Sequence, residues 1–264
     1  MGEAALLLFW PALVGYAEAA LAYAGETVRP GRPARFAVWG VRLGWLAQTA
    51  LLAAQAVRAD GFPWASWAGS LNLFVWLVVG AYLIWGCKPR YRLLGLVVMP
   101  VAALLLAVSY AAGGVAASGE TEYSTLFLVL HVGLLLAGFA GLTLAAALAA
   151  LYLWQDRQLK RRSSTVLRFR APSLVTLESL VARTVAFSLP VLTLGMAAGF
   201  ARVRHGSDLD PLIVLTVLTW TVYGAFLVLR FGAGWRGRRA AYTALAGFAL
   251  VIVLQLSLQA GHFA

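Results

Sequence analysis

Long apolar segments recur along the whole of this 264-residue chain, and they constrain its fold more than any other feature. Each segment is about as long as the 20 or so apolar residues that a helix needs to cross a hydrocarbon core of about 30 Å. The segments are continuous and rich in Leu and Ala, whereas a transmembrane β-strand would alternate polar and apolar residues over about ten positions. The sequence therefore predicts an all-α, polytopic membrane protein.

Composition excludes a soluble globular domain. Hydrophobic residues make up 62% of the chain and charged residues 12%, with a mean hydropathy of +0.82, whereas soluble domains carry about half apolar and a quarter charged residues. Loop-forming residues divide the chain into about eight transmembrane segments within a single transmembrane domain, residues 1–264. The predicted spans are 4–24, 35–57, 67–87, 93–112, 123–153, 179–202, 211–231 and 239–261.

The basic residues predict the orientation of these spans. Most of the 21 Lys and Arg residues fall in four alternate connectors: 25–35, 88–92, 154–178 and 230–239. Because short cytoplasmic loops carry the excess of basic residues, both termini are predicted to face outward. The net charge of +11 is thereby explained by loops beside helix ends, and nucleic-acid binding is not expected. The longest basic loop, 154–178, is predicted to lie against anionic lipid, and docking of a cytoplasmic partner there remains open.

Sequence motifs give little support to catalysis. The chain contains no nucleophile elbow, no phosphate-binding P-loop and no HExxH zinc motif, so a non-enzymatic protein is expected. Cys87 is the single cysteine and has no partner for an internal disulfide.

Two histidines are predicted to lie at a similar depth near the outer boundary of the membrane. His131 lies early in the fifth span, and His262 follows the eighth. Neutral imidazoles on two helices at equal depth can serve as the axial ligands of a haem iron. The alternatives are a hydrogen-bonded interhelical His131 with a terminal His262, and a zinc site completed by outer-loop carboxylates. The third histidine, His205, is interpreted as a solvated loop residue.

Aromatic and charged side chains supply further candidates for the same ligand. Trp64 and Trp67 lie in a predicted outer loop, where they would form either an interfacial aromatic belt or a wall for a porphyrin. Arg42 lies within the second span. It would pair with Glu18 or extend to the interface, or bind a haem propionate or a lipid.

Four strings of the sequence, in their order and spacing, resemble the HemX/CcsA family of membrane cytochrome c assembly and haem-handling proteins, including its YpjD-like members. The resemblance spans residues 35–264, and the strings are HVGLLLAGFAGLTLAAALAALYLWQDRQLKRR at 131–162, LESLVARTVAFSLPVLTLGMAAGF at 177–200, DPLIVLTVLTWTVYGAFLVLR at 210–230 and GWRGRRAAYTALAGFAL at 234–250.

This resemblance implies a ligand set. In the family, two external histidines flank a Trp-rich loop and ligate haem, and two more histidines bind haem within the membrane. His131 and His262 match the external pair, and Asp210 matches the end of the loop. Gln48 and Val228 stand where the membrane histidines are expected. The metal ligands are therefore predicted to be His131 and His262.

In keeping the external histidine pair but not the membrane pair, this sequence resembles the HemX-like branch of the family. The resemblance then implies a non-enzymatic protein of the bacterial cytoplasmic membrane that holds a non-covalent, b-type haem at its outer face. Its role would be haem handling or trafficking, cytochrome c assembly, or control of haem biosynthesis. The alternatives are a haem lyase or cytochrome c synthase subunit acting with an assembly partner, and a haem transporter.

Overall fold

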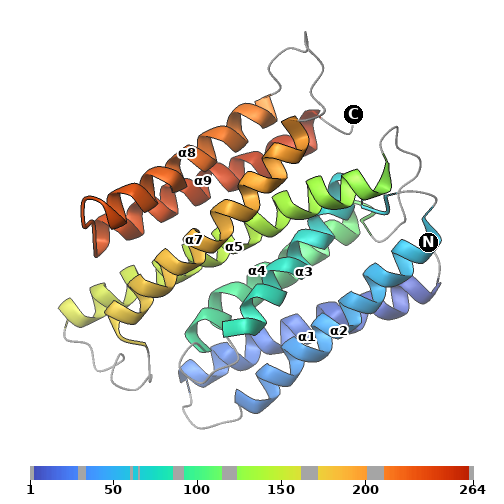
Figure 1. Cartoon of the computed structure of the whole chain (residues 1–264). Helices are drawn as coiled ribbons and strands as arrows, with labels where there is room; N and C mark the ends of the chain where they lie inside the picture. The colour runs from blue at the N-terminus through green and yellow to red at the C-terminus, as the bar shows by residue number, and fades with distance from the viewer. Residues whose placement is uncertain are drawn as a thin grey trace. The chain divides into compact units, whose positions relative to one another are not determined.

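The computed structural model is helical throughout its regular structure (Figure 1). It describes residues 3–28, 34–59, 62–64, 66–85, 92–114, 124–161, 172–200 and 211–261, and these form helices without any strand. The helices are α1 (Glu3–Val28), α2 (Ala34–Arg58), α3 (Trp67–Trp85), α4 (Arg92–Ala111), α5 (Thr125–Lys160), α7 (Leu174–Phe200), α8 (Pro211–Phe231) and α9 (Arg238–Gly261). The all-α prediction is confirmed.

The helices have the length and composition of membrane spans. Among the described residues, seven helices, α1 to α5 with α7 and α8, are long and apolar enough to cross a membrane, and α9 occupies the eighth predicted span. Large apolar side chains such as Leu21 and Phe187 are about three-quarters exposed, at 74% and 75%. Outward-facing apolar side chains suit a lipid environment. A helix also bonds its backbone polar groups internally, as the hydrocarbon core of a bilayer requires. The prediction of a multi-pass membrane protein is confirmed, and the outward placement of both termini stays a prediction.

Contacts divide the chain into two compact units, which we describe separately. Unit 1 comprises residues 1–125 with 168–171, and unit 2 comprises residues 126–167 with 172–264. Unit 1 therefore contains α1 to α4, and unit 2 contains α5, α7, α8 and α9. The assignment of residues 1–264 to one transmembrane domain stays a prediction.

In unit 1, small residues allow α1 and α2 to pack closely. Gly40 and Gly44 lie four residues apart on α2, the GxxxG spacing that lets helix backbones approach each other in membranes. A Cβ atom added to Gly15 of α1 would lie 2.7 Å from the Gly40 carbonyl oxygen and 2.9 Å from the Gly44 Cα. No flexible side chain could move to make room there, so the contact requires glycine.

In unit 2, glycines line the contact between α5 and α7, which we call the α5–α7 seam: Gly138 and Gly141 on α5, with Gly195 and Gly199 on α7. A Cβ added to Gly138 would lie 2.8 Å from the Leu192 Cβ, and one added to Gly195 would lie 2.8 Å from the Leu135 nitrogen. The seam therefore fixes which side chains of α5 lie against the backbone of α7.

Two helices extend beyond the apolar segments that predicted them. The fifth span was predicted to end at residue 153, but α5 continues to Lys160, where Lys160 forms an i,i+4 ion pair of 3.0 Å with Asp156. Helix α7 begins at Leu174 after Ser173, whose Oγ accepts a hydrogen bond of 3.2 Å from the Thr176 nitrogen, as an N-cap does. The predicted loop 154–178 is therefore helical at both ends, because a helix can continue after its residues become polar.

Candidate functional site

His131 lies in the α5–α7 seam of unit 2. It is about 9 Å along α5 from Thr125, at 1.5 Å per residue. Its Nδ1 lies 2.8 Å from the carbonyl oxygen of Gly195 on α7. Because a carbonyl oxygen can only accept a hydrogen bond, Nδ1 carries the proton and Nε2 keeps its lone pair in the neutral ring. None of the described residues donates a hydrogen bond to Nε2.

Two neighbours fix the orientation of the His131 ring. The ring stacks on Phe127, one turn earlier on α5, with centroids 5.5 Å apart and an interplanar angle of 9°. On the α7 side it lies against Gly199, where an added Cβ would overlap the imidazole. Metal-ligating histidines typically donate their second ring nitrogen to a backbone carbonyl or a carboxylate, which fixes tautomer and orientation. The arrangement of His131 has this form.

The second predicted ligand follows α9. Helix α9 begins beside the C-terminal part of α5, where Arg238 Nε lies 3.8 Å from Asp156 Oδ2. It then runs to Gly261, at the end of unit 2 where α5 begins (Figure 1). His262 itself, like Asp210 and His205, lies outside the described residues. The pairing of His131 with His262 and the role of Asp210 therefore stay predictions.

A zinc site was the alternative metal prediction. Within the described part of the chain, no group of three or more His, Cys, Asp and Glu residues could hold a metal ion. The carboxylates considered for that site, Glu120, Glu122, Asp208 and Asp210, lie outside the described residues.

Unit 1 contains the candidate residues Arg42, Trp64 and Trp67, and Arg42 lies far from the two tryptophans. Trp64 donates its Nε1 hydrogen to Gln55 Oε1 at 3.2 Å, and half-buried Trp67 opens α3. Arg42 is exposed, and its guanidinium lies over the Trp39 ring, 5.6 Å from the ring centroid. Thirteen residues of α2, about 20 Å of helix, separate Arg42 from Gln55.

The pairing considered between Arg42 and Glu18 has no counterpart in the structure. Both side chains are exposed, and the ion pairs between described residues do not include one that joins them. A role of Arg42, Trp64 or Trp67 in binding haem stays a prediction.

Gln48 belongs to a buried hydrogen-bonded network that joins α1, α2 and α3. Its Oε1 accepts a bond of 2.6 Å from the Tyr16 hydroxyl, and its Nε2 donates to the Asn72 Oδ1 at 2.8 Å and carbonyl oxygen at 3.0 Å. Asn72 Nδ2 lies 3.4 Å from Gln55 Oε1, which also accepts from Trp64. We call Tyr16, Gln48, Gln55, Trp64 and Asn72 the unit 1 network.

Sequence reasoning had noted Gln48 only as a missing ligand. The overlooked signal is the spacing of Gln48 and Gln55, which are seven residues apart and therefore share one face of α2. The other replaced position, Val228, is 71% exposed on α8, so its side chain points away from the interior of unit 2.

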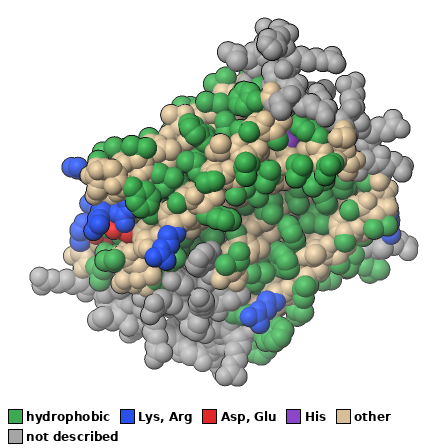
Figure 2. Space-filling view, viewed as in Figure 1, with side chains coloured by type: hydrophobic (Ala, Val, Ile, Leu, Met, Phe, Trp, Pro, Cys, Tyr) green, Lys and Arg blue, Asp and Glu red, His purple; other side chains and the backbone are tan. Residues whose placement is uncertain are grey.

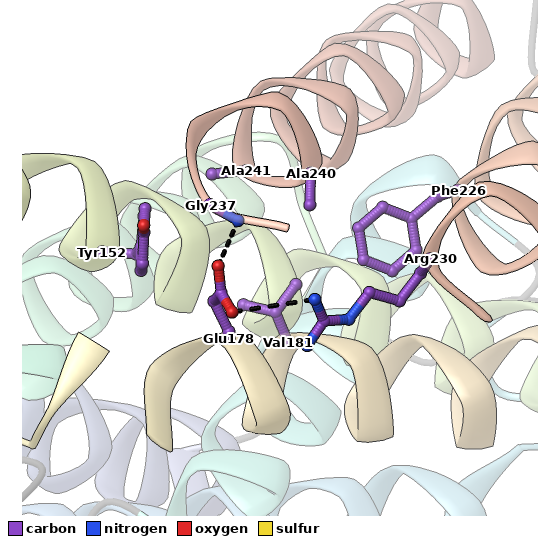
Figure 3. A pocket seen from close by; sticks show the side chains of 8 residues that line it. All are labelled: Tyr152, Glu178, Val181, Phe226, Arg230, Gly237, Ala240 and Ala241. Carbon is purple, nitrogen blue, oxygen red and sulfur yellow. Dashed lines mark hydrogen bonds and ion pairs between the residues drawn. The ribbon is translucent and has the colours of Figure 1, made fainter. Parts of the chain in front are cut away.

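At the opposite end of unit 2 from His131, Glu178 holds the turn between α8 and α9 (Figure 3). The backbone N–H of Gly237 donates to Glu178 Oε1, and Arg230 Nη1 lies 3.7 Å from Glu178 Oε2. A cavity of about 10 Å³ beside these groups, also lined by Tyr152 and Phe226, is large enough for a single water. It is too small for a cofactor, so this cluster is an anchor for the turn.

The fold and these contacts define a class: a polytopic helical membrane protein with one oriented imidazole in a helix seam and a closed polar network in its other unit. A family model described as "Cytochrome C assembly protein" matches residues 64–261, well over half of the chain. The chain belongs to this family of cytochrome c assembly proteins.

Several curated relatives share most of their length with this chain. It is 28% identical over 233 residues to the cytochrome c biogenesis protein CcsA of Guillardia theta, covering 79% of this chain and 77% of the relative. The CcsA protein of Gloeothece citriformis is 28% identical over 271 residues, covering 82% of each chain. That of Microcystis aeruginosa is 27% identical over 307 residues, covering 95% of this chain and 90% of the relative.

Proposed function

We propose that this chain is a haem-binding protein of cytochrome c assembly that holds a non-covalent, b-type haem with His131 as one axial ligand and His262 as the other. The observation that carries this proposal is the hydrogen bond from His131 Nδ1 to the Gly195 carbonyl oxygen, 2.8 Å long. It leaves Nε2 as the ligating nitrogen of a ring that cannot easily rotate, which is the arrangement that supports metal ligation.

The residues present suit an iron porphyrin better than a zinc ion. A haem iron accepts two neutral imidazole nitrogens as axial ligands, whereas zinc usually requires three or four protein ligands. The stacked Phe127 ring adds a flat apolar surface beside the imidazole. In the proposed state, the residues of the α5–α7 seam orient His131, and the end of α9 carries the second imidazole.

The proposed role is haem handling of the HemX-like kind, in trafficking, assembly or control of haem biosynthesis, in a bacterial cytoplasmic membrane. Two observations favour this role over catalysis. Gln48 uses its side-chain oxygen and nitrogen in the unit 1 network, and Val228 offers no ligand atom. Neither of the positions where the family resemblance expects membrane histidines could therefore bind a second haem.

A second candidate is a haem lyase or cytochrome c synthase subunit acting with an assembly partner. It is favoured by the relatives, which are named cytochrome c biogenesis proteins. Deleting the gene in its host and measuring covalent haem in the c-type cytochromes tests this second candidate. Normal cytochromes c would contradict the synthase role.

The haem proposal is tested by a pyridine haemochrome assay and a Soret spectrum on the purified full chain from cells supplied with a haem precursor. We expect about one haem per wild-type chain, with less than a tenth of that in His131→Ala and in His262→Ala. Leu130→Ala is the matched control, because Leu130 precedes His131 on α5 but is half exposed, at 50%.

Rescue by a soluble ligand distinguishes lost ligation from lost folding. Imidazole added at millimolar concentration should restore the Soret band of His131→Ala, because it supplies the missing nitrogen. Haem retained at the wild-type level in both histidine variants, or haem absent from the wild type, would contradict the proposed site.

A further inference from the structure

Charged side chains gather at one end of unit 2, where α5 ends and the turn between α8 and α9 lies (Figure 2). Among the residues described there, seven are basic and two acidic. The basic ones are Arg157, Lys160, Arg161, Arg230, Arg236, Arg238 and Arg239, and the acidic ones are Asp156 and Glu178. We call these nine residues the basic end of unit 2. Its positive charge is uncompensated by the described acidic groups.

Two cations of the basic end are held in position by one carboxylate. Asp156 Oδ2 lies 3.0 Å from Lys160 Nζ and 3.8 Å from Arg238 Nε. The carboxylate side chain is 13% exposed, whereas the Lys160 and Arg238 side chains are 60% and 50% exposed. Asp156 therefore fixes the two cations from the inner side and leaves most of their surface open.

Tyr242 restrains Arg238 further. Arg238 Nη2 donates a hydrogen bond of 3.2 Å to the Tyr242 hydroxyl, and its guanidinium lies over the Tyr242 ring, 5.8 Å from the centroid. A restrained guanidinium loses less conformational entropy when it binds an anion than a mobile one does.

The turn that carries the remaining arginines is also fixed. Gly234 and Gly237 have positive φ angles of 66° and 69°, which glycine adopts without strain. Glu178 accepts from the Gly237 N–H (Figure 3). Arg230 Nη1 donates to the Trp235 carbonyl oxygen at 3.0 Å. These bonds keep the exposed side chain of Arg236 on a defined surface between the two helices.

The length of α5 places this surface at the level of lipid headgroups. A helix of 36 residues is about 54 Å long, and the hydrocarbon core is about 30 Å thick. The charged C-terminal turns from Asp156 onward must therefore project beyond the hydrocarbon. The group that every bilayer offers at that depth is the phosphodiester of a lipid.

We propose that Lys160 and Arg238, with the neighbouring exposed arginines of the basic end, form a binding site for the phosphodiester headgroup of an anionic phospholipid. The uncompensated positive charge selects anionic over zwitterionic lipids, and the two cations that Asp156 holds provide paired donors for phosphate oxygens. A lipid bound there would bridge α5 and α9 at the end of unit 2 opposite His131.

The test uses the delipidated full chain in a neutral detergent, titrated with phosphatidylglycerol or with phosphatidylcholine and followed by native mass spectrometry. One arm substitutes Lys160→Gln together with Arg238→Gln. The matched control substitutes Arg58→Gln together with Arg183→Gln, since both of these arginines are exposed and lie outside the basic end. The two double variants lose the same charge.

We expect wild type and control to bind phosphatidylglycerol at least about tenfold more tightly than phosphatidylcholine, and the Lys160/Arg238 variant to lose that preference. The expectation follows from the roughly fivefold contribution of each cation near an anionic surface, about 30-fold for two cations before screening by Asp156. Equal preference in both double variants would overturn the site and indicate a diffuse effect of net charge.

A competition arm identifies the source of the phosphate. Glycerol phosphate at the concentration of the lipid should leave phosphatidylglycerol bound, because it lacks the acyl chains that hold a headgroup at this depth. Complete displacement would overturn the lipid assignment in favour of a soluble phosphate ligand. A melting temperature of the delipidated double variant within the error of wild type establishes that the loss concerns binding and not folding.

Discussion

Both units pack their helices through glycine contacts, but the polar side chains in these contacts differ: Gln48 of unit 1 is buried, and His131 of unit 2 is half-buried. In unit 1, Gly40 and Gly44 bring α2 against α1, and Gln48 in the same contact has both its oxygen and its nitrogen bonded. In unit 2, Gly195 and Gly199 bring α7 against α5, and His131 in that contact is hydrogen-bonded through Nδ1, to the Gly195 carbonyl oxygen. In unit 1 the polar side chains bond to one another, whereas in unit 2 none of the described residues donates a hydrogen bond to His131 Nε2.

This difference indicates how a polar residue within a membrane unit can be interpreted. A polar group in an apolar surrounding is costly unless it is hydrogen-bonded. A network in which each member has its partners therefore needs no ligand to account for its polar residues. An imidazole that is oriented by one bond to a carbonyl oxygen and retains a lone pair has the arrangement typical of metal-ligating histidines. The comparison therefore gives Gln48 a structural role and supports the proposal that His131 binds a ligand.

The most direct way to break this comparison is to remove each polar centre and measure haem. We expect His131→Ala to lower the haem content of the purified protein at least tenfold, while Gln48→Leu keeps it within a factor of two. The reason is that only the imidazole carries an available nitrogen. The pyridine haemochrome assay measures both variants. Loss of haem from Gln48→Leu protein that still elutes as a monodisperse peak would mean that unit 1 takes part in binding.

The close contact of α1 with α2 should show the largest effect on stability. Gly15→Ala places a methyl group against backbone atoms of Gly40 and Gly44, which cannot move aside, and overpacking of this kind costs about 1–3 kcal/mol. Gly224→Ala on α8 is the control, because a Cβ there meets nothing within 4 Å. That variant should gain up to about 1 kcal/mol of helix propensity.

Unfolding by sodium dodecyl sulfate in mixed micelles, followed by circular dichroism, compares the two glycine variants. Equal midpoints for Gly15→Ala and Gly224→Ala would contradict the close approach of α1 and α2.

The closure of the unit 1 network can be measured by a double-mutant cycle. Tyr16→Phe leaves Gln48 Oε1 without its donor, and Gln48→Leu leaves the Tyr16 hydroxyl without its acceptor, whereas the double variant leaves neither. We expect the double variant to be more stable than the sum of the single losses by about 0.5–2 kcal/mol, as for directly bonded residues. The same unfolding measurement gives the four stabilities.

A second cycle controls for indirect effects within unit 1. Tyr82 donates its hydroxyl hydrogen to Tyr23 at 2.9 Å, and it lies ten residues, about 15 Å, along α3 from Asn72. Tyr82→Phe and Gln48→Leu should therefore be additive. Coupling as large as that of the Tyr16 cycle would show that the energy is spread through unit 1 instead of residing in one bond.

The sequence predicted the helices better than it predicted the contacts between them. Continuous apolar segments predict membrane helices because length and hydropathy are local properties, and the position of His131 near the start of α5 follows from counting residues. The bond of His131 to Gly195 joins residues 64 positions apart. It depends on the rotation and crossing of two helices, which the hydropathy of either helix does not contain.

The ends of helices were the second property that hydropathy could not supply. Helix α5 passes the predicted end at residue 153 and continues through Asp156 to Lys160. Charged residues there end the apolar segment but still form i,i+4 pairs that suit a helix. Hydropathy also could not predict that Glu178 anchors the α8–α9 turn, because that contact joins residues on separate helices.

The smallest expected effect concerns Gln155 on α5, a buried glutamine of unit 2. Its Nε2 donates to the Pro172 carbonyl oxygen at 2.9 Å, but its Oε1 is buried and has no hydrogen-bond partner among the groups described. Gln155→Leu therefore removes one bond and one unsatisfied acceptor, and these changes oppose each other. We expect the unfolding free energy to change by less than about 1 kcal/mol, clearly less than for Gln48→Leu, in which bonded partners on α1 and α3 are left unpaired. A loss equal to that of Gln48→Leu would mean that a bound water satisfies Gln155 Oε1. His131 would then be the only one of these described residues left with a ring or side-chain atom that lacks a hydrogen-bond partner.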